Sequence, residues 1–271
     1  MKQTLQLSQT KYTIDILVQF GMNDCHSVGV PLESGHTTAN TAAINLPDIK
    51  PYQRLIGSLM YLAVATRVDI AQAVNTLARV MSAPTEHHWD LAKRVLRYLK
   101  GTSELGITFS GGSKNILIGY TDSDWAGDIN TRRSCTGYVF MLNKGCISWN
   151  SKLQSTVTLS TAEAEYMSMC TCMQEGIFLR NLLRDMYLIQ QETVINEDNQ
   201  GSIALAKNPI SSTRSKHIDI KFHFVREKIK SKEFYIQYCS TEFNIADLLT
   251  KPLSKERFVK LRDVMLGRNS F

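Results

Sequence analysis

The sequence predicts an α/β protein in which a mainly helical first part precedes a mixed five-stranded sheet flanked by helices. The first observation is the spacing of apolar residues, which is three or four residues before about residue 101 and two after residue 112. The second is the order of the later elements, in which strands joined by hairpins give way to strands joined by helices. The third is the size: 271 residues, 43% of them apolar, suffice for one or two domains with ordinary cores.

Helical spacing dominates residues 51–102. Pro84 ends a first helical run, and a second helix is expected over 86–100, with Gly101 at the place of a C′ glycine. The most apolar stretch within this part is shorter than the roughly 20 residues that span a bilayer, so it predicts a buried helix and no membrane contact. Residues 22–50, rich in Gly, Thr, Asn, Pro and Ser, predict a flexible linker.

Three strands open the second part. The first is expected over 116–121 and ends directly before Asp122. The next two, over 137–142 and 146–149, form a hairpin whose turn takes its positive φ from Gly145. Consecutive strands joined in this way predict antiparallel neighbours in one sheet.

A long helix follows, capped by Ser160 or Thr161 and extending to about residue 186. The remaining elements are a strand at 194–195, helices at 199–207 and 215–230, a strand at 234–239, and two short helices around Asp247 and Phe258. Strands joined by hairpins, followed by crossovers through helices, predict a mixed sheet with helices packed on it.

Charge and cysteine content indicate the compartment and a class of partner. Residues 199–260 contain twelve Lys or Arg and six Asp or Glu, which matches the net charge of +6 for the whole chain. A basic tract of this kind favours a polyanion such as nucleic acid, although a solvated helix face explains it equally well. The six cysteines include no CxxC pair, and the N-terminus lacks the apolar region of a secretory signal, so an intracellular protein with reduced thiols is expected.

Four acidic residues occupy positions that a merely solvated surface does not explain. Asp122 follows the first strand, Glu165 lies in the first turns of the long helix, Asp198 follows a later strand, and Asp247 lies in a late helix. Four carboxylates at one sheet edge suit two hard divalent cations, Mg²⁺ or Mn²⁺. Each acid alone also fits a loop, a helix cap, a first-turn acid or a helix surface, so the joint pattern carries the prediction.

Nearby acids compete for these roles. Asp124, Asp128 and Glu163 lie close in sequence to the four candidates. Asp124 shares one side of its strand with Asp122 by the period of two, so it is expected beside the ligands or in solvent.

The segments around these acids resemble the ribonuclease H domain that closes the Pol polyprotein of copia-type retrotransposons. They are GYTDSDWAGD (119–128), RRSCTGYVF (132–140), STAEAEY (160–166), EDNQGSIALAKNP (197–209), RSKHIDIKFHFVRE (214–227) and NIADLLTKPL (244–253). Three upstream blocks resemble the stretch between the reverse-transcriptase palm and that domain: SQTKYTIDILVQFGM (8–22), YQRLIGSLMYLAVATRVDI (52–70) and HHWDLAKRVLRYLKGT (87–102). The resemblance therefore covers essentially the whole chain.

The resemblance implies a division of the chain and an activity. Residues 1–110 correspond to the end of a reverse transcriptase (palm end and helical thumb or connection), and residues 114–266 to a ribonuclease H-like domain. Asp122, Glu165, Asp198 and Asp247 fall on the four catalytic carboxylate positions, which hold two Mg²⁺ or Mn²⁺ ions. The implied reaction is endonucleolytic hydrolysis of the RNA strand of an RNA–DNA hybrid during reverse transcription.

Partners and location follow from the same resemblance. The implied partners are the hybrid and the remainder of the Pol polyprotein, with its reverse-transcriptase palm and fingers. The implied location is intracellular, in cytoplasmic virus-like particles and in the nucleus. No YxDD motif occurs in the 271 residues, so polymerase activity is not expected of this chain alone.

Six residues are candidates for contacts with nucleic acid. Basic side chains would hold the phosphate backbone through salt-sensitive contacts, and amides next to Asp198 would contact ribose or base edges. For the amides, capping of the following helix is the structural alternative. The candidates are Arg132, Arg133, Asn199, Gln200, Lys216 and Lys221.

The chain departs from the pattern of the resembling family at three positions. Val68 stands where Pro is usual, Thr131 where Asp is common, and Glu197 where a Cys often precedes the DNQ motif. Glu197 adds a charge beside Asp198 that is expected to disturb metal binding. This keeps a second hypothesis open, a catalytically silent nucleic-acid-binding fragment of a truncated Pol protein, and a third, an integrase or transposase of the same superfamily, fits the hairpin-rich start less well.

Overall fold

The computed structural model describes the backbone of residues 3–35, 44–112, 114–207 and 216–269, and the side chains of these residues except 216–219. Short 3₁₀ helices complement the α-helices: η1 (Val68–Ile70), η2 (Thr241–Phe243) and η3 (Ile245–Leu249). The strands are β1 (Thr4–Ser8), β2 (Gly106–Ser110), β3 (Ile118–Asp124), β4 (Cys135–Leu142), β5 (Gly145–Leu153), β6 (Thr193–Glu197) and β7 (Phe234–Tyr238). The helices are α1 (Thr10–Gln19), α2 (Lys50–Ala65), α3 (Ala71–Ala78), α4 (Glu86–Lys100), α5 (Thr161–Asp185), α6 (Gln200–Lys207), α7 (Lys216–Lys230) and α8 (Lys255–Met265).

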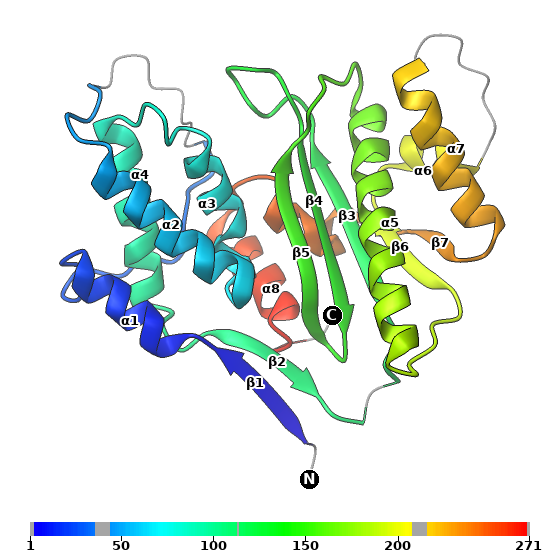
Figure 1. Cartoon of the computed structure of the whole chain (residues 1–271), viewed down its shortest axis with the longest axis horizontal. Helices are drawn as coiled ribbons and strands as arrows, with labels where there is room; N and C mark the ends of the chain where they lie inside the picture. Colours follow the sequence, from blue (N-terminus) through cyan, green and yellow to red (C-terminus); the bar gives the residue numbers. More distant parts are fainter. Residues whose placement is uncertain (1–2, 36–43, 113, 208–215, 270–271) are drawn as a thin grey trace.

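A five-stranded mixed sheet forms the second part of the chain, in the order β5-β4-β3-β6-β7. Strands β3, β4 and β5 are antiparallel neighbours, whereas β6 pairs parallel to both β3 and β7. The hairpins between β3, β4 and β5 and the crossover through α5 from β5 to β6 produce this arrangement. The mixed sheet expected from the sequence is therefore confirmed (Figure 1).

Helices cover both faces of this sheet (Figure 1). On one face α5 packs with α6 and α7, and on the other lie α2, α3, α4 and α8. Because both faces are covered, successive residues of β4 enter two different cores. Tyr138 and Phe140 join the core under α5, while Val139 and Met141 join the core formed with the N-terminal helices.

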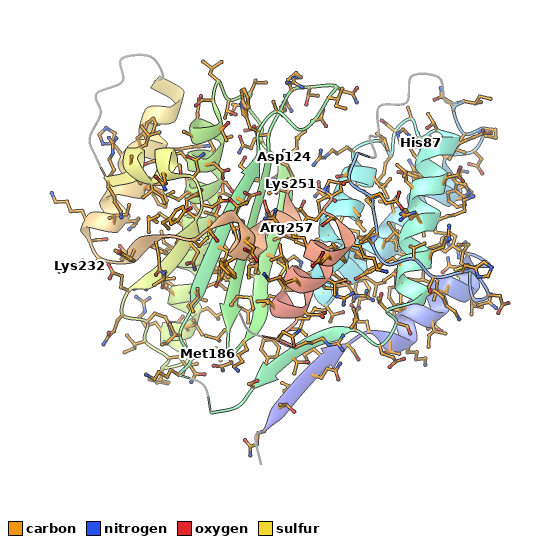
Figure 2. The ribbon with its side chains drawn as sticks, turned by 180° about the vertical axis from the view of Figure 1, so that it is seen from behind. His87, Asp124, Met186, Lys232, Lys251 and Arg257 are labelled. Atoms are coloured by element: carbon orange, nitrogen blue, oxygen red, sulfur yellow. The ribbon has the colours of Figure 1, made fainter. Side chains whose placement is uncertain are left out.

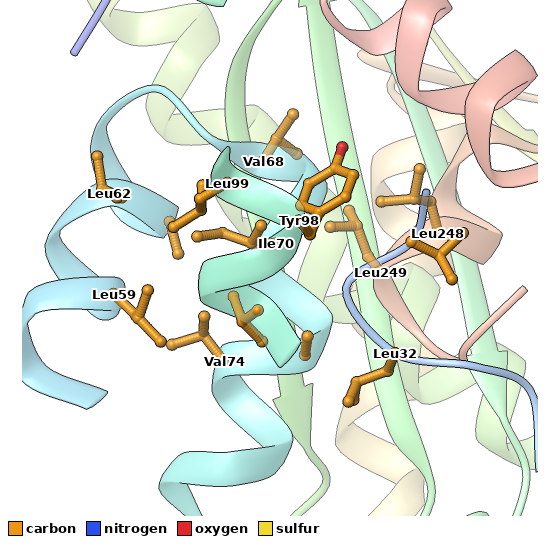
Figure 3. Close-up of a cluster of buried hydrophobic side chains, with 14 of the residues drawn as sticks. Leu32, Leu59, Leu62, Val68, Ile70, Val74, Tyr98, Leu99, Leu248 and Leu249 are labelled. Carbon is orange, nitrogen blue, oxygen red and sulfur yellow. The ribbon is translucent and has the colours of Figure 1, made fainter. Parts of the chain in front are cut away.

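The second of these cores spans the boundary near residue 110 that the sequence predicts. Leu59, Leu62 and Leu99 of the helical part pack in one cluster with Leu248 and Leu249 of η3 (Figure 3). These five side chains are at most 2% exposed. The two-part division of the chain stays a prediction, and residues from both parts share one hydrophobic core.

Strands β1 and β2 form a separate two-stranded antiparallel sheet beside the N-terminal helices (Figure 1). Thr4 pairs with Ser110, so residues about 100 positions apart lie side by side. All five residues of β1 are exposed. This sheet was not predicted from the sequence, because β1 is only five residues long and its partner strand lies about 100 positions away.

A buried ion pair lies in the short segment that joins α2 to α3. Arg67 is 1% exposed and donates from Nε and Nη2 to the two carboxylate oxygens of Asp69, at 2.9 and 2.8 Å. The carboxylate also accepts from the hydroxyl of Tyr98 at 2.7 Å, and Arg67 donates to the carbonyl oxygen of Thr102 at 3.1 Å. Every charged atom of the pair thus has a partner, as burial of charge requires.

The turn between β4 and β5 differs from the prediction. The residues with positive φ are Asn143 (51°) and Lys144 (74°), whereas Gly145 begins β5 and pairs with Leu142. Asn143 and Lys144 thus form a two-residue hairpin turn, in which both central residues require positive φ. Gly145 is needed because a Cβ there would lie 2.7 Å from the ring of Phe109.

Two other local expectations were wrong. Gly101 follows α4, but its φ is −80° and not the positive value typical of a C′ glycine. A glycine is favoured there because a Cβ on residue 101 would lie 2.8 Å from Cβ of Ser27. The described part of the segment 22–50 is not a free linker. Val30 and Leu32 within it are buried against the helices.

The cysteines and the helix lengths were both subjects of expectations from the sequence. All six cysteines are unpaired. Within the described residues, no helix combines the length and the apolar character required to cross a bilayer.

Candidate metal centre

Three acidic side chains meet at the end of the sheet where the parallel strands β3 and β6 finish. Asp122 comes from β3, Glu165 from the first turns of α5, and Asp198 from the residue after β6. One ligand oxygen of each lies within 4.8 Å of the others. The carboxyl ends of parallel neighbours lie at one sheet edge, which explains how residues 122 and 198 converge.

Asp122 lies inside β3, two residues before its end, and not after the strand as the sequence predicted. Its backbone pairs with Gly137 of β4, and its side chain is 2% exposed. The hydroxyl of Thr250 donates to Oδ2. Burial, followed by the nearby charge of Asp247, raises the pKa of Asp122 from 3.8 to about 7.

Glu165 is the most isolated of the three carboxylates. The N-cap Ser160 accepts from the backbone N–H of Glu163 at 3.2 Å and starts α5, which places Glu165 on the buried side of the helix. Glu165 is 4% exposed, and its Oε2 has no hydrogen-bond partner among the described residues. Burial and the charges of Glu197 and Asp122 hold its pKa well above the usual range.

Asp198 is half-buried and is oriented by an amide. The side-chain N–H of Asn244 donates to Asp198 Oδ1 at 3.2 Å and to the carbonyl oxygen of Thr121 at 2.9 Å. Asn244 is fully buried and also caps η3, because its Oδ1 accepts from the N–H of Ala246. This asparagine, which the sequence analysis did not select, therefore links Asp198 to β3 and to the segment that carries Asp247.

Asp247, the fourth predicted ligand, is not part of the group of three. It is buried in η3, and its Oδ1 lies 2.7 Å from Nζ of Lys251. Its Oδ2 pairs with Nη2 of Arg257 from α8. Both oxygens of Asp247 therefore face cations of the chain itself.

Glu197 is a further acid at this site. It is the last residue of β6 and fully buried, with Oε1 accepting from the N–H of Asn199 at 3.0 Å. Its Oε2 lacks a hydrogen-bond partner within the described residues, and burial holds its pKa well above the usual range. From the sequence, Glu197 was expected only to add a charge beside Asp198. In the structure its charge also raises the pKa of Glu165.

The competing acids near the site have local partners. Asp128 accepts from the N–H and hydroxyl of Thr131 and pairs with Arg79 at 3.4 Å. Glu163 accepts from the backbone N–H of Leu159 at 2.8 Å, next to the cap of α5. Burial raises the pKa of Asp124, at the end of β3.

The candidate contacts with nucleic acid have different environments. Arg132 is exposed and Arg133 half-buried in the loop between β3 and β4, and Gln200 is exposed at the start of α6. Asn199 caps α6, because its Oδ1 accepts from the N–H of Ser202 at 2.9 Å, which is the structural alternative that its position suggested.

Two lysines of the basic tract were also candidates. Lys221 is half-buried on α7 and directs Nζ toward Sδ of Met167 at 3.3 Å. The side chain of Lys216 lies outside the described residues. Elsewhere on α7, Lys228 pairs with Glu233 at 2.9 Å, so this cation is partly compensated within the chain.

The group of three carboxylates fits a hard divalent cation. Oxygen ligands within 4.8 Å of one another match the preference of Mg²⁺ and Mn²⁺. The unpartnered, buried Oε2 of Glu165 is an oxygen for which a cation would provide a partner. The raised pKa values of Asp122 and Glu165 have the same cause, which is negative charge held out of water without full compensation.

The chain is similar in sequence to curated retrotransposon proteins. No protein-family model matches the chain. The retrovirus-related Pol polyprotein of transposon TNT 1-94 from Nicotiana tabacum is 41% identical over 270 residues, which cover 96% of this chain and 20% of that protein. The Pol polyprotein of transposon RE2 from Arabidopsis thaliana is 39% identical and covers 94% of this chain and 18% of its own length.

The likeness is not confined to long polyproteins. Secreted RxLR effector protein 161 of Plasmopara viticola is 49% identical over 129 residues, which cover 48% of this chain and 91% of that protein.

Solved structures show the fold. The foamy viral protease-reverse transcriptase, solved in complex with an RNA/DNA hybrid, is 10% identical and matches 91% of this chain and 28% of its own, with a TM-score of 0.52. The expected mixed five-stranded sheet flanked by helices, preceded by a mainly helical part, is confirmed, and the likeness to the foamy viral structure is one of fold. The chain spans about a fifth of the length of the Pol relatives named here, and it belongs to the Pol polyprotein family of copia-type retrotransposons.

Proposed function

We propose that the chain is a metal-dependent endonuclease that hydrolyses the RNA strand of RNA–DNA hybrids during retrotransposon reverse transcription. The observation that carries the proposal is the meeting of Asp122, Glu165 and Asp198, with ligand oxygens within 4.8 Å at one sheet end. A divalent cation held by these oxygens supplies Lewis-acid chemistry for phosphodiester hydrolysis, by activating water and offsetting charge at the phosphate. Mg²⁺ and Mn²⁺ are the cations that suit an all-oxygen set.

The residues of the chain would prepare the site in two ways. Thr250 and Asn244 fix the carboxylates of Asp122 and Asp198 through hydrogen bonds, so that little reorganisation is required when a cation binds. Burial of Glu165 excludes water from one side of the site, which strengthens each electrostatic contact there.

The choice of an RNA–DNA hybrid as substrate rests on family membership and on charge. The matched foamy viral enzyme was solved with such a hybrid. Arg132, Arg133 and Lys221 supply positive charge on the surface of the chain for sequence-independent contacts with phosphates. Recognition of RNA through its 2′-OH groups would follow the general mode of hybrid binding across the minor groove.

The partner and location belong to the same proposal. The remainder of a Pol polyprotein, with the reverse-transcriptase palm and fingers, would act beside this chain, since the chain covers only 20% of the tobacco relative. We place the protein inside the cell, in cytoplasmic virus-like particles and in the nucleus, where reverse transcripts form and are delivered.

A cleavage assay on a labelled RNA–DNA hybrid tests the function. The chain is incubated with Mg²⁺ or Mn²⁺ and compared with the variants Asp122→Asn and Asp198→Asn, with Asp90→Asn as control, because Asp90 is an exposed residue of α4. We expect metal-dependent cleavage by the parent chain and the control, and a loss of at least about 100-fold in both site variants.

The same assay separates the proposal from its alternative. Binding of the hybrid without cleavage in either metal would refute the enzyme and support a catalytically silent nucleic-acid-binding fragment. The pairing of Asp247 with Lys251 and Arg257 is the observation that favours this alternative, because it occupies one of the four predicted ligands. Cleavage that survives both site substitutions would show that these carboxylates are not the catalytic ones.

A further inference from the structure

Lys251 lies between two of the four predicted ligands. Its Nζ is 2.7 Å from Oδ1 of Asp247 and 4.0 Å from Oδ2 of Asp122. Arg257 pairs with the other oxygen of Asp247. In Figure 2, Lys251 and Arg257 lie near one another at the sheet, with Asp124 close to Lys251.

The fold holds this lysine in place through η3. Asn244 caps the start of η3, and the backbone N–H of Thr250 donates to the carbonyl oxygen of Asp247 at 3.2 Å. Lys251 follows Asp247 by four residues, a spacing at which side chains on a helical turn meet. The ammonium group is therefore positioned by the same segment that carries Asp247, and its side chain is only 36% exposed.

Charge is distributed unequally over the four acids. Asp247 faces two cations, and Oδ2 of Asp122 faces Lys251 and the hydroxyl of Thr250. Within the described part of the chain, Glu165 and Asp198 form no ion pair, and the buried Oε2 of Glu165 has no hydrogen-bond partner. The uncompensated charge thus lies on the side of Glu165 and Asp198, away from Asp247.

We propose that Lys251 is a built-in cation that takes the position of a second metal ion between Asp122 and Asp247. The chain then binds a single divalent ion, at Asp122, Glu165 and Asp198. This inference rests on the proposed metal-dependent function and refines it, because it gives Lys251 a positioning role and gives Asp247 a role in holding Lys251. A second ion would bind only after the ammonium group leaves.

The number of bound Mn²⁺ ions tests this inference without any measurement of cleavage. Mn²⁺ is titrated into the whole chain at pH 8, and bound ions are counted by calorimetry and by the electron paramagnetic resonance signal of the free ion. We expect one ion per chain in the parent protein and in Lys251→Arg, and two in Lys251→Met. Lys11→Met, at an exposed position of α1, serves as a matched control and should bind one ion.

Each outcome has a definite meaning. Two ions in the parent chain would overturn the inference whatever the variants do, so the test does not depend on Lys251→Met folding. A count of one in a folded Lys251→Met chain, verified by circular dichroism, would also overturn it. If the parent chain binds two ions and cleaves hybrids, the proposed function stands and only the inference about Lys251 fails. If the chain binds no Mn²⁺ at all, both the proposed function and the inference about Lys251 fail.

Discussion

The substitution Asp122→Asn should stabilise the chain when no metal is present, and more so at high pH. Asp122 is 2% exposed, and burial raises its pKa from 3.8 to about 7. A carboxyl whose pKa is raised on folding stabilises the folded state less and less as pH rises from about 4 to about 7, because the unfolded chain releases the proton while the folded chain retains it. Above about pH 7 the destabilisation is fully present.

The size of this effect follows from the two pKa values of Asp122. At about 1.4 kcal/mol for each pH unit, the difference between 3.8 and about 7 amounts to about 4 kcal/mol at pH 8. At pH 5 the same relation gives about 2 kcal/mol, since the carboxyl is still protonated in the folded chain but largely ionised in the unfolded one. The asparagine side chain does not titrate and removes this dependence.

The assay is urea unfolding in the presence of a chelator at pH 5 and pH 8. The asparagine also changes the hydrogen bond from Thr250, and the pH-dependent part of that bond is already contained in the pKa of Asp122, which the bond lowers. The advantage of the variant over the parent chain should therefore be about 2 kcal/mol larger at pH 8 than at pH 5. An equal advantage or deficit at both pH values would refute the reasoning.

Three further substitutions test the framework around the site by urea unfolding. Arg67→Met leaves the buried carboxylate of Asp69 without its cation and should cost about 3–5 kcal/mol, so a loss below about 1 kcal/mol would contradict the buried pair. Gly145→Ala places a methyl group 2.7 Å from the ring of Phe109 and should cost about 1–3 kcal/mol, and an unchanged stability would refute the close packing of β2 on β5. Asn199→Ala removes the cap of α6 and should cost about 1 kcal/mol without nucleic acid, whereas an effect seen only on hybrid binding would assign the residue to the substrate.

Much of the sheet was predictable because its strands are short apolar runs separated by turn residues. The hairpin of β4 and β5 and the long helix α5 were expected at nearly their observed places. The detailed turn was not, because Asn143 and Lys144 adopt positive φ while the neighbouring glycine does not. Side-chain type alone favours the glycine, and the close approach of Phe109, which comes from a distant strand, decides otherwise.

Pairing between distant segments was beyond the sequence pattern. β1 joins β2 about 100 residues later, and although Leu5 and Leu7 alternate with polar residues in β1, nothing in these five residues identifies that distant partner. The burial of Val30 and Leu32 in a segment rich in turn residues has the same origin, since a few apolar side chains suffice to anchor a loop. Local composition describes a loop well but does not reveal which surface it packs on.

At the candidate site, the carboxylates that converge were easier to predict from the sequence than the residues that surround them. Strand ends and a helix start explain why Asp122, Glu165 and Asp198 meet. The spacing of four residues between Asp247 and Lys251 could have indicated an ion pair. Many pairs with this spacing lie on the surface and contribute little to stability, so the spacing alone does not single this one out. That this pair lies next to Asp122, with Asp247 buried, depends on how η3 packs against the sheet, which is a property of the tertiary fold.

The core shared by the two halves has a consequence for how the chain acquires its structure. The rings of Tyr98 on α4 and Phe258 on α8 lie 5.6 Å apart and edge to face, although 160 positions separate them in the sequence. During synthesis, the apolar surface of the N-terminal helices is therefore covered only after a segment about 160 residues further along the chain has been made. Contacts between residues far apart in the sequence slow folding and leave apolar surface exposed to solvent for longer. Exposed apolar surface promotes aggregation, so we expect this protein to depend on chaperones until α8 has been synthesised.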